Sequence, residues 1–155
     1  MVQFRKITEE NFVQILDMKQ AEGQSFVPPN AESLAQAWLY YENHDVYSFA
    51  VCSGETPVGF MQLYEELEKR TLYLWRVMIA AERQGRGFGT AAVEKIAALA
   101  RESGRYDCIE LGCKPENAGA MHIYEKLGFR PTGEVEHGEV QMRLDFQKKE
   151  SGDLL

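Results

Sequence analysis

A glycine-rich hexapeptide, Gln84-Gly85-Arg86-Gly87-Phe88-Gly89, is the segment of this chain with the clearest chemical meaning. Its three glycines stand at alternate positions, so several successive backbone N–H groups can turn toward one ligand. Residues 71–80 before it have the pattern of a strand, and residues 90–101 after it have the pattern of a helix. The unpaired N–H groups and the positive dipole end of that helix would face the same ligand. The loop therefore predicts a phosphate-bearing cofactor.

Three kinds of phosphate-binding loop can be compared with this hexapeptide. A dinucleotide-binding fingerprint needs GxGxxG, but the spacing here is GxGxG and the loop does not open the first βαβ unit of the chain. A Walker loop needs a lysine after its last glycine, whereas Gly89 is followed by Thr90 and Ala91. The loop that receives the pyrophosphate of coenzyme A has the pattern Gln/Arg-x-x-Gly-x-Gly/Ala, which Gln84, Gly87 and Gly89 match. A glycine-rich turn without a ligand stays open on this motif alone.

Hydrophobic periodicity and turn residues predict eleven elements around this loop, in the order β-α-α-β-β-β-α-β-α-β-β. Thr8 and Asn30 are expected to cap the first two helices, and Gly128 to end the last one in a left-handed conformation. The expected fold is a mixed α/β sheet with helices on both faces, in which only central strands run parallel. The predicted strands are 2–7, 46–52, 58–64, 71–80, 107–113, 129–135 and 139–146, and the predicted helices are 9–20, 30–41, 90–101 and 118–127.

Length and charge limit the classes of function. The 155 residues fit one domain, expected over residues 1–147 with a polar tail over 148–155. The net charge of −7 disfavours nucleic acid as a partner and mildly favours cations. Three cysteines without CxxC spacing indicate reduced thiols in a cytoplasmic protein. No signal peptide, membrane-spanning run or metal site is predicted.

Two linked segments carry a family resemblance. The first is Trp75-Arg76-Val77-Met78-Ile79 followed by the glycine loop, and the second is the run from Asn117 to Phe129, which reads NAGAMHIYEKLGF. In this order and about 30 residues apart, the pair resembles the core of the GNAT superfamily, the acyl-coenzyme A-dependent N-acetyltransferases. The resemblance implies a three-layer α/β/α sandwich with a splayed central strand pair, acetyl-CoA as cofactor, and an amine as acceptor.

The resemblance also implies roles for single residues. Residues 77–79 would part from residues 111–113, and their backbone groups would bind the pantetheine arm and polarise the thioester carbonyl. Tyr124 would protonate the departing thiolate, and Asn117 would both cap its helix and contact the cofactor. A plain core strand, a packing aromatic ring and a simple cap stay open as alternatives. The implied cofactor-binding residues are Val77, Met78, Ile79, Gln84, Gly85, Arg86, Gly87, Phe88, Gly89, Thr90, Asn117 and Tyr124.

The catalytic base does not follow from the resemblance. Many relatives use a glutamate at one of two strand positions, which are Trp75 and Gly112 in this chain. Glu110 precedes Gly112 by two residues and would share its strand face. It is therefore a candidate base, acting through water, although a surface or structural role is as compatible with the sequence.

Three segments, residues 26–30, 74–79 and 132–139, are most similar to bacterial spermine/spermidine acetyltransferases. A polyamine is a flexible polycation, so its site should offer spaced carboxylates and aromatic faces. Another amine acceptor (a protein N-terminus, an amino acid, an aminoglycoside) and a non-catalytic acyl-CoA-binding module stay open, and a homodimer is possible. Residues expected at the acceptor are Glu22, Phe26, Trp75, Glu134, Glu136 and Glu139, unless these carboxylates are ordinary surface charge.

Overall fold

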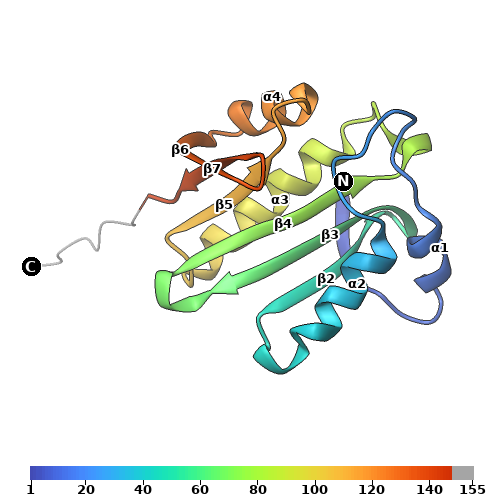
Figure 1. Ribbon diagram of the computed structural model, residues 1–155. Coiled ribbons are helices and arrows are strands. Elements are labelled where there is room, and N and C mark those ends of the chain that lie inside the picture. The colour runs from blue at the N-terminus through green and yellow to red at the C-terminus, as the bar shows by residue number, and fades with distance from the viewer. Residues whose placement is uncertain (148–155) are drawn as a thin grey trace, which may run out of the picture.

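The chain folds into one mixed β-sheet with helices packed on both faces, as Figure 1 shows. The structure is a computed structural model that describes residues 1–147, so the predicted polar tail lies outside the described residues. The predicted element order is confirmed. The strands are β1 (Val2–Lys6), β2 (Val46–Ser53), β3 (Thr56–Glu66), β4 (Thr71–Ile79), β5 (Cys108–Cys113), β6 (Arg130–Glu136) and β7 (Glu139–Asp145), and the helices are α1 (Phe12–Asp17), α2 (Asn30–Leu39), α3 (Phe88–Ser103) and α4 (Ala118–Lys126).

The sheet has the strand order β1-β2-β3-β4-β5-β7-β6. Every neighbouring pair is antiparallel except β4 and β5, which run parallel at the centre and are joined through α3. The expectation that only central strands are parallel is therefore confirmed. None of the helices in residues 1–147 is both long and apolar enough to cross a membrane.

Each face of the sheet has its own hydrophobic core. The larger core lies under α3 and α4, where α3 contributes Ala92, Val93, Ile96 and Ala100 at helical spacing. The smaller core lies under α1 and α2, around Ile15 and Phe60. Burying one such large side chain stabilises the fold by about 1.5–3 kcal/mol. Two cores on opposite faces give the three layers that the sequence predicts.

The N-terminal helices differ from their predicted form. The first was expected over residues 9–20, but α1 spans only Phe12–Asp17 and Thr8 does not cap it, since the helix begins after Asn11. The prediction that Asn30 caps α2 is also wrong. Asn30 is the first helical residue and is buried, and its Nδ2 donates a hydrogen bond to Ile15 O at 2.8 Å. An asparagine that looked like a local cap therefore ties α2 to α1.

The parallel pair β4 and β5 separates along its length. Their ladder runs only from Thr71 opposite Cys108 to Leu74 opposite Leu111. Against β3, the register of β4 shifts so that Trp75 has no partner strand residue, which is a β-bulge. Beyond it, β4 continues to Ile79 without pairing to β5. The predicted splay is confirmed, with the correction that Leu111 is still paired.

Candidate active site

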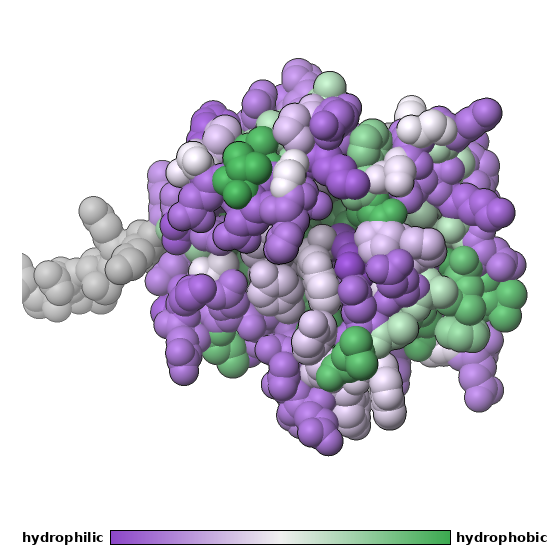
Figure 2. All heavy atoms as spheres, viewed as in Figure 1, coloured by the Kyte–Doolittle hydropathy of each residue, from purple (hydrophilic) through white to green (hydrophobic). Residues whose placement is uncertain are grey.

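A cleft of about 670 Å³ opens where β4 and β5 separate. It is lined by the glycine loop, α4, the segment between α1 and α2, and the turn between β6 and β7. Figure 2 views this side of the molecule, and hydrophobic atoms are visible inside the recess near its centre. The described strands leave the β5-facing edge of β4 unpaired from Trp75 to Ile79. Apart from Ile79 O, which accepts from Gln84 Nε2, backbone donors and acceptors are therefore available along the cleft.

The glycine loop enters this cleft with an open backbone. Gly85 and Gly87 have φ angles of +75° and +82°, and a Cβ built on either would meet no atom within 4 Å. In the described part of the chain, the N–H groups of residues 85–90 donate no hydrogen bond to protein. The sixteen-residue helix α3 begins immediately after Gly87 and has no side-chain cap. These N–H groups and the dipole of α3 form a site for an anion.

Gln84, the first residue of the loop motif, has its side-chain amide engaged by protein. Its Nε2 donates to Ile79 O at 3.0 Å, and its amide group pairs with that of Gln24 through contacts of 3.1 and 3.3 Å. Gln84 lines the cleft, but these bonds fix the loop to the end of β4 and to the segment before α2. Its amide side chain therefore positions the loop.

Positive charge surrounds the loop although the chain is acidic overall. Arg83 and Lys114 line the cleft, whereas the exposed Arg86 is not among the lining residues. Lys114 Nζ also donates to Ser25 O at 2.9 Å, across the cleft from the end of β5. Arg83 and Lys114 were not predicted from the sequence, because neither belongs to a motif. Their side chains suit phosphate groups.

The start of α4 brings two further predicted residues to the cleft. Asn117 is the N-cap of α4, and its Oδ1 accepts from Ala120 N at 3.3 Å. Tyr124, two turns later, lines the same cleft and packs on Phe129 with the ring centroids 5.7 Å apart. Burial raises the pKa of the Tyr124 phenol above its ordinary value, and the nearby Cys113 and Glu139 raise it further. The phenol is therefore protonated at neutral pH.

The opposite end of the cleft is aromatic and acidic. Tyr64 and Tyr73 stack with centroids 4.7 Å apart, and Trp75 meets Tyr64 edge-on at 5.7 Å. Burial, and to a smaller extent the carboxylates of Glu66, Glu136 and Glu110, together raise the pKa of Tyr64 to about 12. Tyr73 donates from its hydroxyl to Gln141 Oε1 at 2.7 Å. This surface can hold a cation against aromatic faces in a negative field.

The structure brings together only part of the predicted acceptor set. Phe26, Trp75, Glu136 and Glu139 line the cleft, but Glu22 and Glu134 are exposed and lie outside its lining. The cleft lining also includes Tyr64, Tyr73 and His137, which were not predicted. The alternation of Tyr73 with Trp75 along β4 is a signal that could have identified Tyr73.

Glu110, the candidate base, does not reach the cleft either. It does share a strand face with Gly112, as expected, because both are half-exposed between buried neighbours. However, it lies outside the residues that line the cleft, and its carboxylate pairs with Arg143 on the next strand, with Oε1 3.7 Å from Nε.

Residues 12–129 match the acetyltransferase (GNAT) family. This chain belongs to the GNAT family. An uncharacterized N-acetyltransferase of Methanocaldococcus jannaschii is 32% identical over 110 residues, which are 68% of this chain and 47% of that protein. This chain thus spans about half the length of that relative. A spermine/spermidine N(1)-acetyltransferase of Bacillus subtilis is 25% identical over 91% of this chain and 96% of its own length.

Solved structures share the GNAT fold over nearly the whole chain. A chimera of Vibrio cholerae spermidine N-acetyltransferase and hSSAT superposes with a TM-score of 0.76 at 19% identity, covering 93% of this chain and 95% of the chimera. Aminoglycoside acetyltransferase AAC(6')-Ib in complex with coenzyme A superposes with a TM-score of 0.75 at 19% identity, covering 94% and 95%. At these identities the likeness establishes the fold.

Acetyl-CoA is the cofactor of GNAT acetyltransferases, and the cleft fits it. Unpaired N–H groups of residues 85–90, with open space at Gly85 and Gly87, suit its pyrophosphate. The unpaired edge of β4 suits the amides of its pantetheine arm, as an added strand would.

Proposed function

We propose that this protein transfers the acetyl group of acetyl-CoA to a primary amine, and that the amine belongs to a polyamine such as spermidine or spermine. The observation that carries the proposal is one continuous cleft with two chemically opposite ends. One end offers backbone N–H groups and cations, and the other offers aromatic rings and carboxylates. An anionic carrier and a cationic acceptor would therefore meet at the bulge in β4.

The cofactor end acts through backbone. N–H groups of residues 85–90 bind phosphate, and the free edge of β4 beyond the bulge orients the pantetheine arm. When bound, acetyl-CoA supplies an acetyl group activated as a thioester. An unpaired N–H of Val77 or Ile79, which face the gap because Ala80 and Met78 direct theirs at β3, lies where it can donate to a carbonyl oxygen as negative charge develops on it.

Tyr124 holds a proton for the leaving sulfur. Its raised pKa keeps the phenol protonated across the physiological range, and no described residue accepts a hydrogen bond from its hydroxyl. A high pKa also makes the phenol a reluctant donor. It therefore works best as a relay, passing its proton on while taking one from the acylated nitrogen, so that phenolate does not accumulate.

The acceptor end favours a polycation. Glu136 and Glu139 line it, and their charges, together with that of Glu110 outside the lining, raise the pKa of Tyr73 beyond the effect of burial. Among the described residues, Arg76 is the arginine in this part of the lining, and protein holds it: Arg76 Nη1 donates to Ser33 Oγ at 2.9 Å and to Gln62 Oε1 at 3.2 Å. The Bacillus subtilis spermine/spermidine N(1)-acetyltransferase supports the same acceptor class.

The test is release of coenzyme A thiol, followed with a chromogenic thiol reagent, across a panel of amines. We expect turnover with spermidine and spermine to exceed that with amino acids, aminoglycosides and a peptide N-terminus. Glu136→Gln should raise the KM for polyamine several-fold and leave the Kd for coenzyme A unchanged, whereas Glu102→Gln, at the exposed end of α3, should change neither.

Each outcome of the panel has a separate meaning. Turnover with another amine only would refute the polyamine assignment and keep the acetyltransferase activity. Coenzyme A binding by calorimetry with no thiol release for any amine would refute catalysis and leave an acyl-CoA-binding module.

A further inference from the structure

We propose that Glu139 is the general base that takes the proton from the acceptor ammonium, and that Gly112 keeps the space for its carboxylate. This inference rests on the proposed function, because it assigns a residue to the amine acetylation described above. A primary alkylammonium has a pKa near 10.4 and must lose a proton before its nitrogen can attack. Some group in the cleft must therefore receive that proton.

The placement of Glu139 depends on a missing side chain one strand away. Glu139 opens β7 and Gly112 lies near the end of β5, on adjacent antiparallel strands. A Cβ built on Gly112 would overlap Glu139 Oε2 and would lie 2.9 Å from Gln141 Nε2 and 3.2 Å from Glu139 Cβ. The volume that a side chain at position 112 would fill is therefore occupied by the Glu139 carboxylate.

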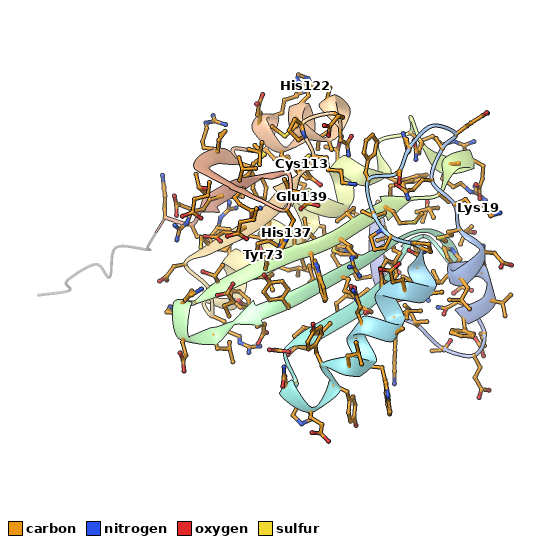
Figure 3. All side chains as sticks on the ribbon, in the orientation of Figure 1. Lys19, Tyr73, Cys113, His122, His137 and Glu139 are labelled. Carbon is orange, nitrogen blue, oxygen red and sulfur yellow. The ribbon has the colours of Figure 1, made fainter. Side chains whose placement is uncertain are left out.

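This carboxylate lies at the junction of the two ends of the cleft. Its charge raises the pKa of Tyr124 and of Cys113 from the cofactor end, and that of Tyr73 from the acceptor end. Figure 3 shows Glu139 between Cys113 and Tyr73. A proton acceptor at this junction is close to both the amine and the leaving sulfur.

Glu139 is also free to accept a proton. Its side chain is half-buried, and within residues 1–147 it forms no ion pair and accepts no hydrogen bond. Its backbone is held instead: Gln141 Nε2 donates to Glu139 O at 3.3 Å, while Gln141 Oε1 accepts from the Tyr73 hydroxyl. The backbone of Glu139 is therefore held in place, while its carboxylate oxygens are available to accept a proton from the substrate.

The other candidates fit less well. Glu110 is paired with Arg143 and lies outside the cleft. His137 lines the cleft, but it is exposed in the β6–β7 turn, and its φ of +51° is the left-handed conformation of a turn residue. The remaining charged groups facing Glu139 are Glu136 on the hairpin and Arg76 on β4, and the latter is hydrogen-bonded to Ser33 and Gln62.

The proposed step is a single proton transfer. The acceptor R–NH₃⁺ gives one proton to Glu139, so that the carboxylate becomes a neutral carboxylic acid and the nitrogen keeps its lone pair for attack. The proton then leaves to water through the open cleft, which restores the carboxylate. The second nitrogen proton goes to the leaving sulfur by way of Tyr124, and one proton is released per turnover.

The experiment compares the wild type with Glu139→Gln, Glu110→Gln, Glu102→Gln and Gly112→Ala, using spermidine thiol release at pH 7.0 and 9.4. Glu139→Gln should lower kcat/KM about 100-fold at pH 7. Much of this loss should disappear at pH 9.4, because the free-amine fraction rises about 200-fold between these pH values. Glu110→Gln and Glu102→Gln should stay within about twofold of the wild type.

Two further variants separate a base from a structural residue. Gly112→Ala should lower kcat/KM at least about tenfold, because its Cβ displaces the carboxylate, and yet bind coenzyme A like the wild type by calorimetry. In a Glu139→Ala background, Gly112→Glu should restore part of the activity by supplying a carboxylate to the same volume. Thermal unfolding and the Kd for coenzyme A confirm that each variant is folded.

The outcomes are distinguishable. Turnover by the wild type with an equal rate for Glu139→Gln, or with an equal loss at both pH values, overturns Glu139 as the base. A loss confined to Glu110→Gln assigns the base to Glu110 instead. Absence of turnover by the wild type with every amine overturns the proposed function, and this inference with it.

Discussion

Replacing Gly87 by alanine separates the stability of the glycine loop from its ligand. Gly87 has a φ of +82°, and a side chain there must adopt the left-handed region, which costs about 1–2 kcal/mol. Gly104, at the C-terminal cap of α3, has a φ of +67° and the same open surroundings, but lies outside the cleft. Gly87→Ala and Gly104→Ala should therefore each lower the Tm, by about 2–4 °C per kcal/mol.

Only Gly87→Ala should weaken coenzyme A binding. The new Cβ would occupy the open space above the loop and displace a phosphate from the N–H groups of residues 85–90. Loss of one hydrogen bond to a charged group costs about 1.5–3 kcal/mol, or about 10- to 150-fold in Kd. Calorimetric titration with coenzyme A measures the difference. If both variants bind coenzyme A as tightly as the wild type, the loop does not hold the pyrophosphate.

Two further predictions concern single side chains, and a third concerns the tyrosines as a group. Tyr124→Phe should lower kcat at least about 100-fold without changing the Kd for coenzyme A, and full activity would exclude a proton-donating role. Asn30→Ala should reduce the free energy of unfolding by about 1–3 kcal/mol in urea titration, because the buried Ile15 carbonyl loses its donor. Since raised phenol pKa values make the folded state bind more protons than the unfolded state above pH 10, stability should fall as pH rises through that range. Absorbance at 295 nm should show that five of the seven tyrosines titrate above the ordinary pH range of a phenol, and ordinary midpoints would contradict this prediction. The five are Tyr47, Tyr64, Tyr73, Tyr106 and Tyr124.

The central part of the fold follows from local rules. Three consecutive sequence signals agree with one another there: a run of apolar strand residues predicts β4, three glycines predict the loop, and apolar residues at helical spacing predict α3. The first helix was predicted too long. The polar residues on either side of it are compatible with a helix, but no hydrophobic core lies beneath them to stabilise one. The helix is six residues long, and of these only Ile15 is buried against the sheet. Propensity cannot set a boundary that tertiary contact decides.

The acceptor site was harder to predict, because it is assembled across strands that are distant in the chain. Glu22 and Glu134 were chosen for being acidic and near the expected cleft, and both face solvent. Tyr64 and Tyr73 become a stacked pair only through the β3–β4 register. Glu110 shares a strand face with Gly112, as expected, but the sequence could not show that Arg143 would lie opposite it.

Gly112 shows how the absence of a side chain can have a function. In sequence it marks a position where a base was expected and none is present. In the fold it leaves a volume that a neighbouring strand fills with the carboxylate of Glu139. Gly112 lies opposite Gln141, and Glu139 is its diagonal neighbour on the paired strand. Because a long side chain can reach across such a diagonal, a group absent from one strand can be supplied from the next. Residue positions along β5 alone therefore underdetermine the chemistry of this cleft, and the pair of strands β5 and β7 has to be read as a unit.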